Sequence, residues 1–481
     1  MKNEILNYLY QRSDRHWLIG YDNQQLPHLT KELLVELSEF TLKEKRSPRI
    51  LIAETNPLQF LASFVAAVAA ETHVFLGNPY WERQEWKQVF NLIQPDLVWG
   101  KEEINSPFPI PHSPFPIPHP LIMIPTGGSS GKIRFAMHTW STLSASVAGF
   151  CEYFNREQVN SCCVLPLYHV SGLMQFLRSF LTDGRLAIFP YPALKRGEQP
   201  EIEPQEFFIS LVPTQLQFLL QSDPNWLSRF QTVLLGGAPA WRSLLDSARK
   251  HRIRLAPTYG MTETASQVAT LEPEDFLQGN DSSGQILPHA KISIQNETGE
   301  LLDTQETGNI IIEADSLYLG YYPYLSAESK STSFTTDDLG FFDPQGYLHI
   351  VGRHSQKIIT GGENVFPAEV EAAILATNLV TDVVAIGLPD SQWGQVVTAV
   401  YVPKNLEVST TLIQQKIKQQ LSKYKQPKHW IRVNNLPRDE RGKINYQQIT
   451  ELARNYLDKN IEANYLKFTI QGTKNLDGGS D

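Results

Sequence analysis

A glycine-rich loop at residues 126–132 is the first part of this sequence that could do chemistry. It follows the apolar run 121–124. Glycines let consecutive backbone N–H groups converge on an anion, and hydroxyl side chains add donors, so the loop could hold phosphate. The spacing excludes a Walker A loop for two reasons. The stretch between Gly127 and Gly131 is one residue too short, and Ile133 stands where the Mg²⁺-binding hydroxyl should be. A Gly/Ser-rich loop without a ligand is the alternative. The loop consists of Thr126, Gly127, Gly128, Ser129, Ser130, Gly131 and Lys132.

Two later segments offer carboxylates beside other polar groups. Thr262 and Glu263 place a hydroxyl next to a carboxylate, and such oxygen ligands suit Mg²⁺. Asp338 is followed by Arg353. A carboxylate there could accept both hydrogen bonds of a vicinal diol. The neighbouring Asp337 is an alternative by adjacency.

Cations gather towards the C-terminal end of the chain. Residues 409–443 are rich in Lys and Arg and end in Lys443, a flexible point charge. A positive lobe on an acidic protein suggests an anionic ligand. A solvated helix face is the alternative.

Taken in order, the glycine loop and the segments 255–263, 335–353 and 436–443 resemble the motifs of the adenylate-forming superfamily of acyl-CoA synthetases, adenylation domains and luciferases. The resemblance runs from about residue 120 to 446. It implies that a carboxylate attacks the α-phosphate of ATP to give an acyl-adenylate and pyrophosphate, and that a thiol then displaces AMP. ATP, Mg²⁺ and coenzyme A are the cofactors that it implies.

The resemblance also implies a role for each motif. The glycine loop would hold the β- and γ-phosphates, Thr262 would donate to the α-phosphate and Glu263 would bind Mg²⁺. Asp338, with Arg353 nearby, would accept the ribose hydroxyls. Lys443 would bridge the reacting carboxylate and the α-phosphate. The residues expected around adenine are Gly236, Gly237, Ala238, Tyr259 and Gly260.

Three positions depart from the usual pattern of that superfamily. Arg134 stands where the glycine loop is usually followed by lysine, Ser355 replaces the common hinge aspartate, and Tyr446 replaces an arginine after the catalytic lysine. Arg134 can supply the missing positive charge.

A lone arginine in an apolar segment indicates which acid is activated. Arg178 follows His169 by nine residues in an apolar helical run, and a buried arginine needs a partner. A structural ion pair is one alternative, and a second carboxylate on the substrate is the other. The segments 165–178 and 210–216 are similar to those of the o-succinylbenzoate–CoA ligases of menaquinone and phylloquinone synthesis. That likeness implies an aromatic dicarboxylate as substrate. It also implies that Arg178 and Ser210 lie in the acyl pocket, and that His169 lines this pocket near the reacting centre.

These residues need a layered scaffold to position them. Helical periods alternate with short apolar runs such as 49–53 and 73–77, which indicates an α/β fold. We expect a large N-terminal domain over 1–352, with helix-sandwiched β-sheets and a small β-barrel-like subdomain at 284–352. A mobile α+β domain should follow at 353–455, and then a tail at 456–481. The repeated proline-rich segment 106–120 favours a surface loop.

Composition excludes several classes of function. The chain has 481 residues and a net charge of −9, which argues against nucleic acid as the main partner. Its longest apolar run, 60–70, is too short to cross a bilayer, so we expect no membrane insertion and a cytoplasmic enzyme. The three cysteines show no metal-binding spacing. A ligase for another aryl or fatty acid, and a non-catalytic nucleotide-binding protein, remain alternatives, and a homo-oligomer is possible.

Overall fold

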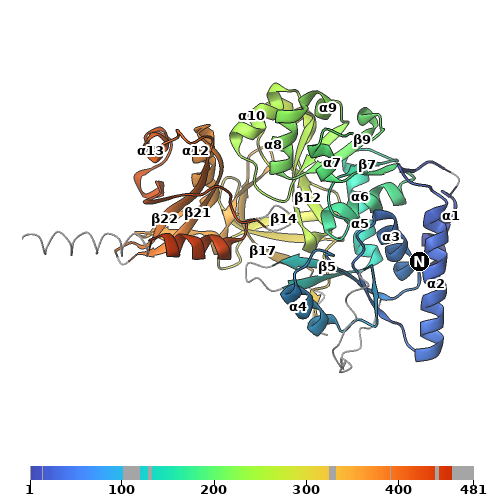
Figure 1. Cartoon of the computed structure of the whole chain (residues 1–481). Helices are drawn as coiled ribbons and strands as arrows, with labels where there is room; N and C mark the ends of the chain where they lie inside the picture. The colour runs from blue at the N-terminus through green and yellow to red at the C-terminus, as the bar shows by residue number, and fades with distance from the viewer. Residues whose placement is uncertain are drawn as a thin grey trace, which may run out of the picture. The chain divides into compact units, whose positions relative to one another are not determined.

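The computed structural model describes residues 2–13, 15–100, 120–127, 133–323, 332–390, 392–438 and 444–457 (Figure 1). The chain divides into two compact units. The first comprises Met1–Ala238, Asp246–Thr336 and Gly340–Ile350, and the second comprises Pro239–Leu245, Asp337–Leu339 and Val351–Asp481. The boundary that we place at residue 352 stays a prediction. The predicted proline-rich loop and most of the predicted tail lie outside the described residues.

The largest sheet of the first unit has eight strands, with order β1-β8-β7-β9-β10-β11-β12-β13. They are β1 (Leu18–Ile19), β7 (Asn160–Cys163), β8 (Leu186–Ile188), β9 (Phe207–Leu211), β10 (Thr232–Leu235), β11 (Leu255–Met261), β12 (Ser266–Thr270) and β13 (Gln285–Ile286). Neighbours from β1 to β11 pair parallel. The remaining pairs are antiparallel. All four residues of β10 are buried, as expected for a parallel strand covered on both faces.

A second sheet has the order β16-β6-β5-β3-β2-β4. It contains β2 (Arg49–Ile52), β3 (His73–Leu76), β4 (Leu97–Trp99), β5 (Ile122–Gly127), β6 (Ile133–His138) and β16 (Tyr321–Tyr322). The apolar runs at 49–53 and 73–77 are therefore strands, as predicted. β5 and β6 pair antiparallel, so the glycine loop connects two antiparallel strands rather than a strand and a helix.

A smaller, four-stranded sheet occupies the region expected for the β subdomain. Its order is β14-β15-β17-β18, with β14 (Ala290–Gln295), β15 (Gly308–Ala314), β17 (Phe334–Phe342) and β18 (Leu348–Arg353). A tight turn follows Phe342 at the end of β17. The backbone N–H of Gly346 donates to Asp343 O at 2.9 Å, and Gly346 has φ +82°.

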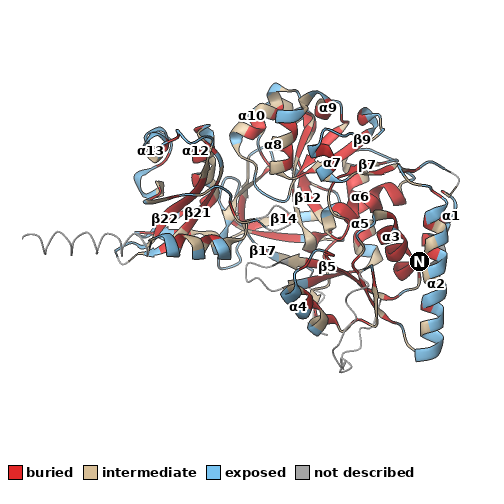
Figure 2. Cartoon of the chain, in the orientation of Figure 1, coloured by how far each residue is buried: buried red, intermediate tan, exposed pale blue. Residues whose placement is uncertain are grey.

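Helices of the first unit pack against these sheets (Figure 1). They are α1 (Lys2–Tyr10), α2 (Gln25–Glu44), α3 (Pro57–Ala69), α4 (Arg83–Ile93), α5 (Trp140–Tyr153), α6 (Val170–Leu181), α7 (Tyr191–Lys195), α8 (Pro213–Ser222), α9 (Pro224–Ser228) and α11 (Pro273–Leu277); α10 (Arg242–Lys250) begins in the second unit. Asn56 caps α3 by accepting from two backbone N–H groups, and Pro57 starts it. Figure 2 shows α3 almost wholly buried, whereas α2 exposes much of its surface.

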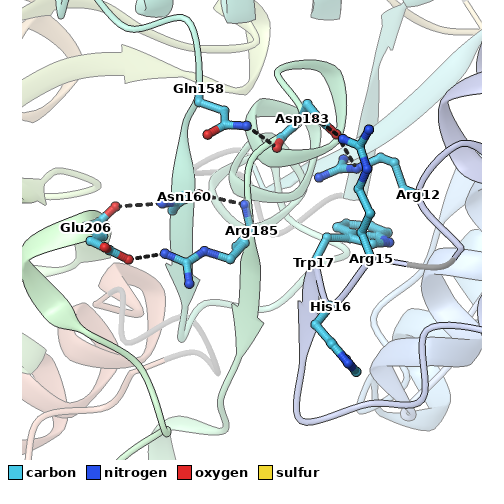
Figure 3. Close-up of a pocket in the computed structure, with 9 residues that line it drawn as sticks. All are labelled: Arg12, Arg15, His16, Trp17, Gln158, Asn160, Asp183, Arg185 and Glu206. Carbon is cyan, nitrogen blue, oxygen red and sulfur yellow. Dashed lines mark hydrogen bonds and ion pairs between the residues drawn. The ribbon is translucent and has the colours of Figure 1, made fainter.

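A network of arginines holds the segment before β1 to the end of α6 (Figure 3). The buried guanidinium of Arg12 donates to the carbonyls of Ser179, Phe180 and Gly184 and pairs with Asp183. It also lies 4.2 Å from the centre of the Trp17 ring. Cations are favourable at a helix C-terminus, so Arg12 ties α6 to the N-terminal segment.

The second unit is a compact α+β body. Its sheet has the order β20-β19-β22-β21, with β23 beside β22. The elements are β19 (Ile358–Thr360), β20 (Glu363–Val365), α12 (Pro367–Ala376), β21 (Val380–Asp390), β22 (Gly394–Pro403), α13 (Thr410–Ile417) and β23 (His429–Arg432). One face of the sheet shares a hydrophobic core with α12 and α13. The predicted fold class is thus confirmed. Within the described residues, no helix is both long and apolar enough to cross a membrane.

Candidate active site

The carboxyl ends of four adjacent parallel strands carry most of the predicted residues of the first unit. β7, β9, β10 and β11 lie side by side. Ser210 lies in β9 opposite Leu234 of β10, and Gly236 follows directly after β10. Tyr259 lies near the end of β11, and His169 begins α6 after β7. Ligands of open α/β sheets bind at this edge, so the structure brings these residues to a suitable place.

Close backbone contacts explain the glycines of the predicted adenine site. A Cβ on Gly260 would lie 2.1 Å from Ser266 O, and one on Gly236 would lie 2.6 Å from Thr258 Oγ1. Gly237 has φ +80°, a conformation that favours glycine. Tyr259 is only 8% exposed and belongs to a hydrophobic cluster, so at most a small part of it faces solvent. The adenine role of these residues, and of Ala238 beside them, stays a prediction.

Thr262 and Glu263 form a tight turn at the end of β11. Residues Thr262–Thr264 make one turn of 3₁₀ helix. Ala265 and Ser266 then take φ values of +51° and +100°. Non-glycine residues pay for such conformations, which persist only where the surroundings hold them. The backbone after Glu263 is therefore held in a conformation that an unrestrained chain would rarely adopt.

Three side chains hold the carbonyl groups of this turn. His138 is fully buried and its Nε2 bonds Thr262 O at 2.8 Å, so Nε2 carries the proton because a carbonyl can only accept. Ser146 donates to Ala265 O at 2.7 Å, and Ser316 donates to Thr264 O at 2.9 Å. Burial lowers the pKa of His138 to about 4, against a weaker opposing effect of the bond to Thr262, so the ring is neutral at pH 7.

A chain of contacts joins Glu263 to the strands of the glycine loop. The Tyr321 hydroxyl donates to Glu263 Oε1 at 2.5 Å. The Arg134 guanidinium lies 4.3 Å from the centre of the Tyr321 ring. Arg134 pairs in register with Thr126, the first residue of the loop. Arg134, which replaces the usual lysine, is thus linked to Glu263 through the Tyr321 side chain. Residues 128–132 of the predicted phosphate loop lie outside the described residues.

The donor set around Glu263 fits Mg²⁺ bound mainly through a nucleotide. Within the described part of the chain, no three His, Cys, Asp or Glu side chains are close enough to hold a metal ion together. Mg²⁺ commonly uses one or two carboxylates together with substrate phosphates and water. The residue Glu263 is 7% exposed, and its carboxylate offers the hard oxygen ligands that this mode of binding requires.

Arg178 is buried without a carboxylate partner among the described residues. It is 3% exposed and lies on α6, as the sequence predicts. One terminal nitrogen donates to Ser266 Oγ and to Gln267 Oε1, each at 3.1 Å. The guanidinium lies 4.1 Å from the centre of the Phe150 ring, and its buried Nε has no hydrogen-bond partner among the described residues. Burial lowers the pKa of Arg178 to about 10, which still leaves it charged at pH 7.

His169 stands at the beginning of α6. Its backbone carbonyl accepts from Leu173 N, and its ring lies 4.6 Å from that of Tyr168. The preceding loop crosses α6 at Gly172, where a Cβ would lie 2.1 Å from Pro166 O. Gly172 therefore lets the loop that carries His169 approach the helix closely. The role of His169 stays a prediction.

In the second unit, Asp338 and Arg353 lie together. Arg353 Nε donates to Asp338 Oδ1 at 3.2 Å. The neighbouring Asp337 is engaged differently, because it accepts from the backbone N–H and the hydroxyl of Ser355. The unusual Ser355 thus has a defined partner in Asp337, and the ribose role of Asp338 stays a prediction.

The described residues on each side of Lys443 are well anchored, while Lys443 itself lies outside the described residues. Arg438 forms an ion pair with Asp382 at 2.7 Å and a β-bridge with Ile444. Tyr446 packs against a hydrophobic cluster, and burial raises its pKa to about 12. Tyr446, which replaces the expected arginine, therefore contributes to hydrophobic packing.

Sequence reasoning missed the side chains that hold the Thr262–Glu263 turn. His138, Ser146, Ser316 and Tyr321 lie far from that turn in sequence. Only His138 carried a local signal, a histidine just before the N-cap residue of a helix. The others are ordinary serine and tyrosine residues whose partners depend on the tertiary fold.

The sequence matches two family models and is similar to known enzymes. The model of the family "AMP-binding enzyme" matches residues 99–322, and that of the "AMP-binding enzyme C-terminal domain" matches residues 369–443. A 2-succinylbenzoate–CoA ligase of Geobacillus sp. is 32% identical over 339 residues, which are 69% of this chain and 68% of that protein. The enzyme of the same name from Bacillus subtilis is 30% identical over 340 residues, 69% of each chain.

Solved structures were compared in the same way. The o-succinylbenzoate CoA synthetase of Bacillus subtilis with its acyl-adenylate intermediate matches with a TM-score of 0.80 and 25% identity, over 92% of this chain and 97% of that chain. The same enzyme with ATP and magnesium matches with a TM-score of 0.75 and 25% identity, over 92% and 98%.

Proposed function

The chain belongs to the AMP-binding, adenylate-forming enzyme family, and we propose that within it the protein is the ligase that joins o-succinylbenzoate to coenzyme A. The reaction consumes ATP and releases AMP and pyrophosphate. This product belongs to the synthesis of menaquinone or phylloquinone. The observation that carries the choice of acid is Arg178, whose buried charge lacks a carboxylate partner among the described residues.

The first half-reaction joins the acid to AMP. The succinyl carboxylate attacks the α-phosphate of ATP, and pyrophosphate leaves. The glycine loop that begins at Thr126 holds the β- and γ-phosphates, and Thr262 donates to the α-phosphate. Glu263 holds Mg²⁺, which neutralises phosphate charge when bound. Lys443 adds a positive charge between the reacting carboxylate and the α-phosphate. Fixed positive groups of this kind stabilise the charge that develops during transfer.

The remaining assignments concern orientation of the nucleotide and the second half-reaction. Asp338 accepts the ribose hydroxyls, with Arg353 beside it. Tyr259 and the glycines around it border adenine. His169 lines the channel of the acyl group near the mixed anhydride. The thiol of coenzyme A then attacks the acyl carbonyl and AMP leaves. The C-terminal domain that the sequence predicts over 353–455 moves between the two half-reactions.

The physical case for an aromatic dicarboxylate rests on the energy of a buried charge. Leaving a guanidinium buried without an opposite charge is unfavourable, and the Phe150 ring and two neutral hydrogen bonds offset only part of the cost. The benzoate carboxylate of o-succinylbenzoate supplies the missing charge. Ser266, which Arg178 contacts, lies three residues after Glu263 in the chain, and this short separation supports an acyl pocket next to the site of adenylation.

Pyrophosphate release tests the proposal. The purified protein receives ATP, Mg²⁺, CoA and one acid at a time: o-succinylbenzoate, benzoate, a coumarate or a medium-chain fatty acid. We expect o-succinylbenzoate to be preferred by at least about 100-fold in kcat/KM. Preference for a monocarboxylate would overturn the choice of acid and leave the family assignment intact.

The variant Lys443→Ala separates catalysis from nucleotide binding. We expect it to bind ATP like the wild type but to lose pyrophosphate release with every acid, because the interaction that it removes acts on the transition state. Unchanged pyrophosphate release would refute the role of Lys443. No acid-dependent release by the wild type would indicate a non-catalytic nucleotide-binding protein.

A further inference from the structure

His289 is a partly buried residue that none of the assignments above uses. It lies directly before β14, on the approach to the small sheet. Both ring nitrogens are buried, and neither has a hydrogen-bond partner among the described residues. An unsatisfied buried polar group costs about 1–3 kcal/mol, and native structures contain few of them. Two unsatisfied nitrogens on a single imidazole ring therefore need an explanation.

The ring of His289 lies beside the Arg178 site. A Cβ built on Gly149 would lie 1.9 Å from His289 Nδ1, so the ring rests on the backbone of α5. The next residue of α5, Phe150, has its ring 4.1 Å from the Arg178 guanidinium. The charge of Arg178 also acts directly on the imidazole, since it lowers the pKa of His289. His289 and Arg178 therefore flank the same turn of α5.

The surrounding groups keep the imidazole neutral. Burial is the largest cause of a pKa lowered to about 4; Asp315 acts in the opposite direction, and Arg178 adds to the lowering. At pH 7 the ring therefore has one N–H donor and one acceptor nitrogen. A neutral donor beside a fixed cation suits a carboxylate, because the cation supplies the charge and the imidazole supplies a directed hydrogen bond.

Arg178 offers an unused donor of its own in the same place. Its Nε is buried and has no partner among the described residues, while one terminal nitrogen is held by Ser266 and Gln267. Two neighbouring side chains, one charged and one neutral, thus each keep a buried donor that the described protein does not satisfy. A single anion between them would satisfy both.

We propose that His289 is a second recognition residue for the aryl carboxylate of the acid substrate, donating a hydrogen bond to the carboxylate that pairs with Arg178. This inference rests on the proposed function and adds a specificity residue to it. His289 does not contact the reacting carboxylate, so it determines which acid is accepted rather than the rate of adenylation itself.

The test compares two acids that differ only in the aryl carboxylate, o-succinylbenzoate and 4-oxo-4-phenylbutanoate. The variant His289→Phe keeps a ring of similar size and removes both nitrogens. We expect kcat/KM for o-succinylbenzoate to fall about 10- to 100-fold, mostly through KM, and kcat/KM for 4-oxo-4-phenylbutanoate to stay within about threefold. His289→Gln, which keeps a donor, should recover part of the loss.

The Tm of the ligand-free variants distinguishes a recognition role from a structural role, because the two roles predict opposite changes in Tm. We expect the Tm of His289→Phe to equal or exceed that of the wild type, because the substitution removes unsatisfied polar groups from a buried position. A lower Tm, together with an equal loss of activity on both acids, would show that His289 is structural and overturn the inference.

The outcomes also separate this inference from the proposed function. If the wild type prefers o-succinylbenzoate and His289→Phe keeps that preference, the role of His289 is refuted and the proposed function stands. If the wild type neither binds o-succinylbenzoate nor releases pyrophosphate with it, both are refuted.

Discussion

At the scale of single residues, the position of the Glu263 carboxylate depends on neighbours that are distant in sequence. Tyr321 donates to it, Arg134 lies over the Tyr321 ring, and His138 holds the carbonyl of the preceding Thr262. The motif around Glu263 could be recognised from sequence because its residues are consecutive. Its supporting contacts could not, since each joins residues more than fifty positions apart and depends on how the sheets pack.

The first prediction at this scale concerns Glu263→Gln. The amide keeps the size of the side chain and can still accept from Tyr321, but it loses the charge that attracts Mg²⁺. We expect pyrophosphate release at about 1 mM Mg²⁺ to fall at least about 100-fold, with partial recovery at higher Mg²⁺.

A surface variant controls for the loss of charge in general. Glu274→Gln removes an exposed carboxylate that pairs with Arg254, and we expect its Mg²⁺ dependence to match the wild type. If Glu263→Gln also gave the wild-type Mg²⁺ curve, Glu263 would not be the metal ligand.

At the scale of elements, α6 shows how the fold positions the acyl site. His169 starts this helix, Arg178 lies in its second half, and Arg12 binds the carbonyls at its end. The apolar pattern of 170–181 was sufficient to predict the helix and the burial of Arg178. The anchor at Arg12 could not be predicted, because nothing in its local sequence distinguishes it from the neighbouring Arg15.

We predict that Arg12→Met destabilises the protein strongly. The substitution removes the donor from three carbonyl groups, and each buried acceptor left unsatisfied costs about 1–3 kcal/mol. Asp183 is half-exposed and keeps its pair with Arg15, so the carbonyls account for the loss. The free energy of unfolding in urea measures the effect.

Arg15→Met is the matched control, because the Arg15 side chain is 63% exposed and pairs with the same aspartate. An exposed pair of this kind contributes at most about 1 kcal/mol. Equal effects of the two substitutions would show that the buried network does not anchor α6.

At the scale of the whole molecule, buried neutral histidines make stability depend on pH. Burial lowers the pKa values of both His73 and His138 to about 4, from about 6.5 in an unfolded chain. Between these values the unfolded chain binds protons that the native protein does not. Stability is therefore fully present above pH 6.5 and is lost as the pH falls towards 4.

The variant His138→Gln tests this dependence. Removing one titrating group should reduce the slope of unfolding free energy between pH 6.5 and 4 by up to about 1.4 kcal/mol per pH unit. The control is His28→Gln, which replaces an exposed histidine by the same residue, glutamine. An unchanged slope in His138→Gln would mean that His138 is protonated in the native protein.

The α/β class could be predicted because short buried runs alternate with helical periods along most of the first unit. The order of the eight-stranded sheet could not be predicted. β1 pairs with β8, more than 160 residues away, and such pairings depend on how the whole unit closes its core. The antiparallel pairing of β5 and β6 around the glycine loop was also unforeseen, because the same loop chemistry occurs before helices in other phosphate-binding proteins.

The central claim is that Arg178 selects an acid with a second carboxylate, and one comparison tests it most directly. The kcat/KM ratio of o-succinylbenzoate to 4-oxo-4-phenylbutanoate is measured for the wild type, Arg178→Ala and Arg185→Ala. Arg185 is the control, since it pairs with Glu206 at the opposite, amino-terminal edge of the large sheet. We predict a ratio of at least about 100 for the wild type and Arg185→Ala, falling to within about threefold of unity for Arg178→Ala. A ratio that Arg178→Ala leaves unchanged, or a wild type that accepts both acids equally, would contradict the account.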